Sequence, residues 1–339
     1  MTPPAPFNPA PFDPLSRRQM LGRLGGGFGA IGVASALAAD RSPSHYGGKA
    51  KRVIQLFMNG GPYQGDLFDP KPALKTYEGQ RPEGATLRTE RITGGLLPSI
   101  RKFAPRGDSG VIVSDLLPEI SKVIDDICVL KACHSDNPNH NPAMYLMNCG
   151  ALTSAVPSVG SWLSYGLGSL NKDLPDFVVM PSAFWSGRVN VQALYARLWG
   201  SSFLPSKHQG TPFQTVGDPV LFLSNPKGID GKVRRRMLDT LAKLNQKHLA
   251  EIKDPEIQTT IAQQEMAFRM QSSVPELTDI SKEPKEVMAM YGPEVNKTGS
   301  YARNCLLARR MIERDVRFVQ LFHRGWDHHS RLPDNLKGQ

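Results

Sequence analysis

The histidines of this chain are concentrated in two short segments that also carry other metal-binding side chains. Of the eight histidines, His134 and His140 lie in one segment, and His323, His328 and His329 lie in another. Imidazole can bind a divalent metal, donate a proton to an anion or act as a base. Because each segment follows an apolar run of strand length, the sequence predicts that the two segments form a common site.

A third polar segment, which follows the first apolar run, supplies oxygen donors. It contains Asn59 and then Asp66. Amide and carboxylate oxygens suit Mg²⁺, Ca²⁺ or Mn²⁺, and with imidazole they also suit Zn²⁺. Both residues are therefore candidate metal ligands. The alternative is a turn in which the Asn59 side chain only caps the backbone.

The first histidine segment leads into an apolar run that predicts a helix beginning at His140. The N-terminus of a helix attracts phosphate and sulfate. We therefore expect His140 to be a catalytic residue or ligand, His134 to bind metal, and Asn139 and Asn141 to bind an anion. The alternative is that Asp136 or Asn139 only caps the helix while His134 packs.

The second histidine segment combines a carboxylate with two imidazoles in the order Trp326-Asp327-His328-His329. Asp327 and His329 would point to the same side of an extended chain, so both are candidate metal ligands. An ordinary surface loop is the alternative, but the preceding strand and the two companion segments favour a site.

Apolar runs that alternate with helical patterns must position these residues. Strands are expected over residues 53–58, 111–113, 127–130, 177–180 and 316–321, and helices over about 117–124 and 301–313. This alternation predicts an α/β fold with a doubly wound, mainly parallel sheet and helices on both faces. The polar segments then lie beyond the carboxyl ends of the strands, where such sheets bind ligands.

A helical lobe is expected over about residues 228–290. Apolar residues recur at helical spacing across 232–272, and Asp254-Pro255 divides this stretch into two helices. The basic run from Lys232 to Arg236 is interpreted as a solvated helix face, because no aromatic platform or nucleic-acid motif accompanies it. We therefore expect no nucleic-acid partner.

The composition predicts a globular protein with a mild preference for anionic partners. The 339 residues are 40% hydrophobic and 21% charged, with a net charge of +10. The four cysteines form no CxxC pair, which argues against a structural zinc site. They are expected to be buried thiols or to form one disulfide, but not between Cys128 and Cys133, which would face opposite sides of a strand.

Residues 1–39 resemble a twin-arginine signal peptide. Ser16-Arg17-Arg18-Gln19-Met20-Leu21 precedes an uncharged stretch rich in glycine and alanine, which contains Ala36-Leu37-Ala38 as a candidate cleavage site. This stretch is too short and too rich in glycine for a stable membrane span. The expectation is twin-arginine export to the periplasm or cell envelope, leaving a domain over 40–339. An ordinary basic N-terminus is the alternative.

The remaining chain resembles an exported bacterial family known as domain of unknown function fifteen-oh-one, within the alkaline phosphatase and sulfatase superfamily. Four segments carry the resemblance: Phe57-Met58-Asn59-Gly60-Gly61-Pro62 with the following Asp66 to Pro72, Asn139-His140-Asn141-Pro142-Ala143, Gly160 to Gly168, and Gly325-Trp326-Asp327-His328-His329. The resemblance implies an alkaline phosphatase-like fold with a divalent metal at its site.

In that superfamily the nucleophile begins a helix that a glycine closes ten positions later. Gly150 places His140 at this position, where the superfamily has Ser, Thr or Cys. His140 could act through nitrogen or bind metal instead. Asp327 and His329 resemble later ligands of the superfamily, although their spacing is two rather than four. Further ligands would follow Gln339, so the chain is expected to lack the last third of its domain.

These observations lead to two functional hypotheses. The first is an exported, metal-dependent hydrolase-like protein that acts on phosphate or sulfate esters, with Zn²⁺, Mn²⁺, Ca²⁺ or Mg²⁺ as cofactor. The second is a non-catalytic binding or surface-associated module with the same fold, which holds a sulfated or otherwise acidic polysaccharide.

Overall fold

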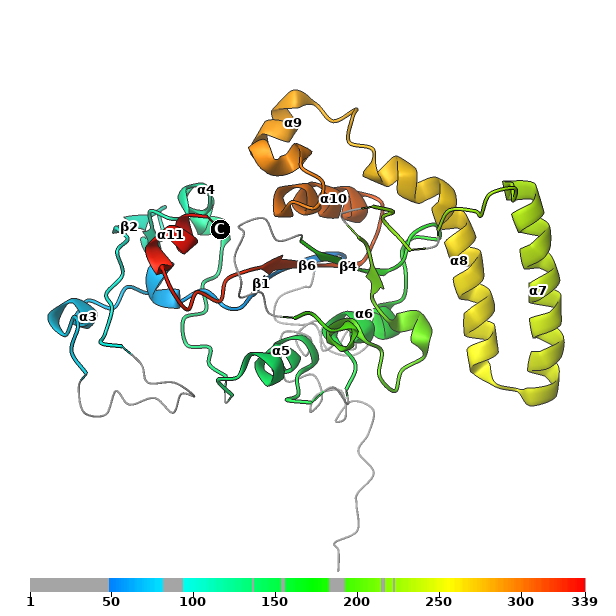
Figure 1. The fold of residues 1–339 in the computed structure, drawn as a ribbon, viewed down its shortest axis with the longest axis horizontal. Helices are drawn as coiled ribbons and strands as arrows, with labels where there is room; N and C mark the ends of the chain where they lie inside the picture. Colours follow the sequence, from blue (N-terminus) through cyan, green and yellow to red (C-terminus); the bar gives the residue numbers. More distant parts are fainter. Residues whose placement is uncertain are drawn as a thin grey trace, which may run out of the picture.

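The main sheet of the protein has four parallel strands. The computed structural model describes residues 49–81, 94–135, 137–153, 156–182, 193–214, 217–221 and 223–338. In sheet order the strands are β1 (Val53–Asn59), β6 (Phe318–Arg324), β4 (Phe177–Pro181) and β5 (Thr211–Pro212). The mixed α/β architecture with a parallel sheet is therefore confirmed (Figure 1).

The strand register brings distant parts of the chain to one edge. Val53 pairs with Phe318, and at the carboxyl end Asn59 pairs with Arg324. On the other side of β6, Phe177 also pairs with Phe318. The residues that follow β1 and β6 therefore emerge beside each other.

Helices cover both faces of this sheet (Figure 1). One face carries α5 (His140–Cys149) and α6 (Val159–Leu167), and the other carries α10 (Tyr301–Glu313) with the second half of α8 (Pro255–Thr278). Alternate residues of a strand point to opposite faces. Accordingly, Phe318 and Phe322 join the core on the α5 side, whereas Val319 and Leu321 join the core on the α10 side.

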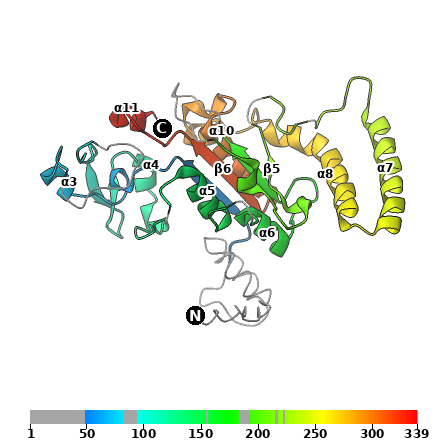
Figure 2. The ribbon, with the colours of Figure 1, turned by 60° about the horizontal axis from the view of Figure 1, so that its bottom comes forward.

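The two helices predicted across 232–272 are present. They are α7 (Gly231–Ile252) and α8, and α9 (Lys285–Met290) follows them. Lys253 ends α7 in a left-handed conformation, and the Asp254 side chain then caps α8. The pair projects from one end of the sheet with α7 outermost (Figure 2).

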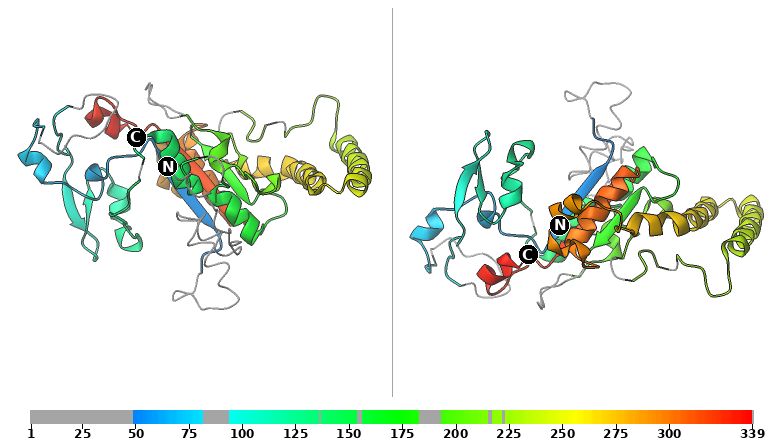
Figure 3. Two further views of the ribbon diagram at one scale, coloured as in Figure 1. Left: turned by 90° about the horizontal axis from the view of Figure 1, so that it is seen from below. Right: turned by 90° about the horizontal axis from the view of Figure 1, so that it is seen from above.

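A smaller antiparallel unit lies at the opposite end of the sheet from α7 (Figure 3). It contains the β2 (Phe103–Arg106) and β3 (Val111–Ser114) hairpin. Short helical segments complete the described chain: α3 (Ala73–Thr76), α4 (Pro118–Ser121), α11 (Leu332–Lys337), η2 (Gln64–Asp66), η3 (Ile124–Asp126), η4 (Ala196–Trp199), η5 (Ser206–His208) and η6 (Pro293–Asn296).

Three expectations from the sequence are wrong in this region. Residues 111–113 form a strand, but it pairs in the hairpin and not in the main sheet. Residues 127–130 form no strand, because no strand of the described residues pairs with them, and Ile127 and Leu130 are 38% and 58% exposed. The helix expected over 117–124 is reduced to the short α4.

The cysteines are free thiols, so the disulfide considered from the sequence is absent. Cys149 is buried and Cys305 partly buried, and burial raises their pKa values to about 12 and about 11. Cys128 and Cys133 are exposed, contrary to the expectation of buried thiols.

The remaining expectations concern residues at the N-terminus. Residues 1–39, which resemble an export signal, lie outside the described part of the chain. Within the described part, no helix has both the length and the apolar character needed to cross a membrane.

Candidate metal centre

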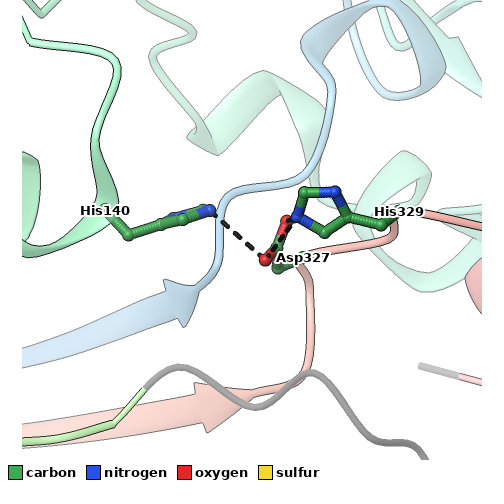
Figure 4. Close-up of side chains that lie close together, drawn as sticks. All are labelled: His140, Asp327 and His329. Carbon is green, nitrogen blue, oxygen red and sulfur yellow. Dashed lines mark hydrogen bonds and ion pairs between the residues drawn. The ribbon is translucent and has the colours of Figure 1, made fainter. Parts of the chain in front are cut away.

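Three side chains from two distant parts of the sequence, His140 in one and Asp327 and His329 in the other, meet at the carboxyl edge of the sheet (Figure 4). The His140 Nε2 atom lies 3.3 Å from Asp327 Oδ2. The His329 Nε2 atom lies 2.9 Å from each of the two Asp327 oxygens. One nitrogen or oxygen from each residue falls within 4.8 Å of the others, which places all three donors around a common point.

The chemistry and spacing of these donors fit a transition metal. A single ion bound at about 2.0–2.2 Å by each ligand holds those ligand atoms about 3–4 Å apart. The measured separations of 2.9 and 3.3 Å agree with this requirement. Two imidazoles and one carboxylate form the donor set that zinc and neighbouring metals accept.

Helix α5 positions His140. The Asn139 side chain caps α5 by accepting a hydrogen bond from the Asn141 amide at 3.1 Å, which makes His140 the first helical residue. Near the other end of α5, the Gln320 side chain donates to Asn148 Oδ1 at 2.6 Å. This buried bond connects α5 to β6 and fixes how far His140 extends past the sheet.

The turn after β1 positions Asp327. The Trp326 amide donates to the Asn59 carbonyl at 3.1 Å, which extends the pairing of β1 and β6 beyond the strands. Gly60 has φ +107°, and a Cβ atom there would lie 2.4 Å from the Asp327 nitrogen. Glycine at this position therefore allows the two chain segments to touch.

An aromatic stack on the other face supports the same turn. The His323 ring lies 4.0 Å from the Tyr301 ring of α10 and parallel to it, and Trp326 meets His323 edge-on at 5.3 Å. Burial lowers the His323 pKa to about 4, so this imidazole is neutral at ordinary pH. His323 is thus a packing residue and not part of the cluster.

Solvent reaches the centre from the His329 side. The Asp327 side chain is 13% exposed and the His329 side chain is 58% exposed. A metal ion held here would have protein on one side and water on the other. Such an open coordination position is typical of catalytic metal sites.

The family model described as "Protein of unknown function (DUF1501)" matches residues 50–339, which include every element that forms this centre. The chain belongs to this family. No curated protein and no solved structure matches the chain. The family assignment predicted from the sequence is therefore confirmed, and it leaves the activity of this DUF1501 protein open.

The structure of this DUF1501 chain brings together only some of the expected ligands. His140, Asp327 and His329 meet, whereas Asp66 and His134 do not belong to the same group of donors. Asp66 lies in η2 and is 2% exposed, and no described residue forms a hydrogen bond with its Oδ2 atom. Asn59 is fully buried and contributes its carbonyl to the joint with Trp326.

The first turn of α5 provides few donors for an anion. The Asn141 amide is used by the Asn139 side chain, the Ala143 amide bonds to the Asn139 carbonyl, and Pro142 has no N–H. The capping alternative for Asn139 therefore holds in this DUF1501 protein. Anion binding by Asn139 and Asn141 stays a prediction.

Two features of the centre were not assigned from the sequence. Gly60 allows the Asp327 backbone to approach the end of β1, a contact that the sequence alone does not reveal. Tyr301, at the start of α10, was not singled out at all. Its place opposite His323 depends on how α10 packs across the sheet, which the spacing within either segment does not contain.

Proposed function

We propose that the protein is an exported, metal-dependent hydrolase of phosphate or sulfate esters, with a doubly wound fold of the alkaline phosphatase and sulfatase type. The observation that carries this proposal is the convergence of His140, Asp327 and His329 at the carboxyl edge of a parallel sheet. This edge is the usual ligand-binding position in open α/β sheets.

The donor set narrows the choice among the four metals considered from the sequence. Ca²⁺ and Mg²⁺ prefer oxygen ligands, whereas the centre offers two imidazole nitrogens and one carboxylate. Zn²⁺ or Mn²⁺ is therefore the expected cofactor. When bound, such an ion supplies Lewis-acid polarisation of an ester oxygen.

The protein side chains divide the remaining work by their exposure. The carboxylate of Asp327 is mostly shielded from water and lies within 3.3 Å of the Nε2 atoms of both imidazoles, so it is the central member of the cluster. His329 is the most exposed of the three, so an ion held by the cluster would be accessible to water and substrate from this side. Because all three side chains would hold the ion, none of them is free to attack the ester, so we infer that water is the nucleophile.

The test uses the full chain and the variants His140→Ala and Asp327→Ala. We expect the parent to bind about one Zn²⁺ or Mn²⁺ and to cleave aryl phosphate or aryl sulfate esters. Each variant should lose at least about 100-fold in kcat/KM, because each removes a ligand of the ion. His248→Ala, on the outer helix α7, is the matched control and should retain parent activity. Activity that survives in both cluster variants contradicts the proposal.

A non-catalytic binding module is the second candidate. The observation that favours it is His140 itself, which occupies the helix position where the resembled superfamily has a nucleophile, in a chain with net charge +10. Salt-sensitive retention on a sulfated polysaccharide, with no bound metal and no ester cleavage, would support this function, whereas stoichiometric metal binding favours the hydrolase.

Export is a separate part of the proposal, and it rests on Arg17-Arg18 and the apolar stretch that follows. Changing both arginines to lysine should leave the protein in the cytoplasm if the twin-arginine machinery exports it. Cell fractionation measures this directly, and unchanged recovery from the envelope would contradict it.

A further inference from the structure

Arg324 is a cation at the same edge of the sheet as the metal centre. It is the last residue of β6, and its register partner is Asn59 at the end of β1. Its backbone amide lies 3.4 Å from Ser182 Oγ, just beyond the end of β4. Arg324 therefore lies at the carboxyl end of the central strand, three residues before Asp327.

The Arg324 side chain lies on the face of the sheet that α5 covers. Phe322 packs against Phe57 and Trp199 on this face, and Gln320 donates to Asn148 of α5. Because side chains alternate along a strand, Arg324 continues the row formed by these two residues. His323 belongs to the opposite row and stacks on α10.

The same helix brings His140 to the level of Arg324. From Gln320 to Arg324 the strand advances about 13 Å. From Asn148 back to His140 the helix covers about 12 Å. Gln320 and Asn148 are hydrogen-bonded, and His140 lies 3.3 Å from Asp327, which follows Arg324 by three residues, so α5 runs antiparallel to β6. Arg324 and His140 therefore flank the same space.

The Arg324 guanidinium is partly dehydrated and is not balanced by a neighbouring acid. Its Nε atom is buried and makes no hydrogen bond within the described part of the chain. Burial lowers the Arg324 pKa, and no acidic side chain among the described residues raises it. Arginine nevertheless stays protonated. An uncompensated cation in such a place costs stability unless an anion binds to it.

We propose that Arg324 binds the tetrahedral oxyanion of the substrate, that is, the phosphate or sulfate group whose ester bond lies at the metal centre. This inference rests on the proposed function. The planar guanidinium can donate two parallel hydrogen bonds to two oxygens of one such group. Arg324 thus supplies the donors that the first turn of α5 lacks.

Titration calorimetry of the full chain with inorganic phosphate and sulfate tests this proposal, in the presence of Zn²⁺. Arg324→Gln should weaken binding of the anion by about tenfold or more, and Arg324→Lys should recover part of it. Arg52→Gln is the matched control, because it removes the same charge near the amino end of β1, and it should bind like the parent. Zinc affinity should be the same in all four proteins.

Thermal unfolding separates a binding role from a structural role. Because the buried Nε atom of Arg324 makes no hydrogen bond within the described residues, Arg324→Gln should keep or raise the melting temperature, whereas loss of a structural arginine would lower it. Equal anion affinity in parent and Arg324→Gln overturns the proposal, as does a parent that binds neither anion. A parent that binds phosphate through Arg324 but binds no metal would support this inference and contradict the metal-dependent hydrolase.

Discussion

Two arginines on opposite sides of the main sheet differ in how completely their buried guanidinium nitrogens are hydrogen-bonded. Arg310, on α10, is 8% exposed, and each of its guanidinium nitrogens has an acceptor: Nε bonds to the Leu277 carbonyl at 2.8 Å, Nη2 to the Glu276 carbonyl at 3.0 Å and Nη1 to Glu283. Arg324, on the α5 side, has a buried Nε that finds no acceptor among the residues that the structure describes. A fully satisfied charge indicates a structural role, and an unsatisfied one near a cluster of ligands indicates a binding role.

The largest effect is expected at Arg310. Arg310→Gln removes the cationic donor of two carbonyls in a buried place and leaves Glu283 with Arg309 as its remaining partner, so the free energy of unfolding should fall by about 4 kcal/mol. Urea denaturation measures this change. Arg314→Gln breaks a pair with the exposed Glu276 and should cost less than about 1 kcal/mol. Equal losses of unfolding free energy in Arg310→Gln and Arg324→Gln would contradict the distinction between a structural and a binding arginine.

The next effect is a pH dependence that arises at His323. Its pKa falls from 6.5 in the unfolded chain to about 4 in the fold. Between these values the unfolded chain binds the proton first, so the contribution to stability is complete above pH 6.5 and is lost as the pH falls towards 4, by about 3 kcal/mol in total. His323→Phe should remove this part of the pH slope. Parallel stability curves for parent and variant would contradict the assignment.

A smaller effect is expected at the contact between Gly60 and Asp327. Gly60→Ala introduces a Cβ atom at a backbone φ that alanine avoids and in collision with the Asp327 backbone, at a cost of about 2 kcal/mol. Zinc affinity should fall with it because Asp327 moves. Gly61→Ala is the matched control: Gly61 also has positive φ, but nothing lies within 4 Å of the added Cβ. If both variants keep parent zinc affinity, the contact does not position Asp327.

The smallest effect concerns the cap of α5. Asn139→Ala should lower the free energy of unfolding by about 1 kcal/mol, while Asn139→Ser keeps an oxygen that can cap and should be nearly neutral. Phosphate titration of the serine variant then asks whether Asn139 binds anions. If the affinity for phosphate is unchanged, anion binding is assigned to Arg324 alone. A large loss of phosphate affinity would show that Asn139 also binds the anion.

Short-range patterns predicted the elements of the sheet and the lobe well. The buried apolar run at Phe177 and the helical spacing across 301–313 each have a strong local signal, and the structure confirms both. The run at Ile127 failed because an apolar run becomes a strand only where another strand can pair with it. Residues 111–113 do form a strand because they pair with β2, a strand that the sequence pattern did not predict.

The candidate site was predictable to the extent that it depends on sheet geometry. The rule that ligands lie beyond the carboxyl ends of parallel strands brought His140 together with Asp327 and His329. It could not exclude His134, whose position depends on the course of a loop. Nor could it find Arg324, because a cation at a strand end is common. The buried Arg324 Nε atom can be recognised as lacking an acceptor only when the described side chains around it are placed.

The pairing of β1 with β6 also has a consequence for the order of folding. Beside these strands, Arg52 and Asp315 form an ion pair between residues that are 263 positions apart in the chain. Closing so long a loop precedes any gain from the contacts it makes, which slows folding. During synthesis, β1 cannot pair with β6 until nearly all of the described chain has emerged from the ribosome. We therefore expect the nascent protein to depend on chaperones for longer than its helical segments alone would require.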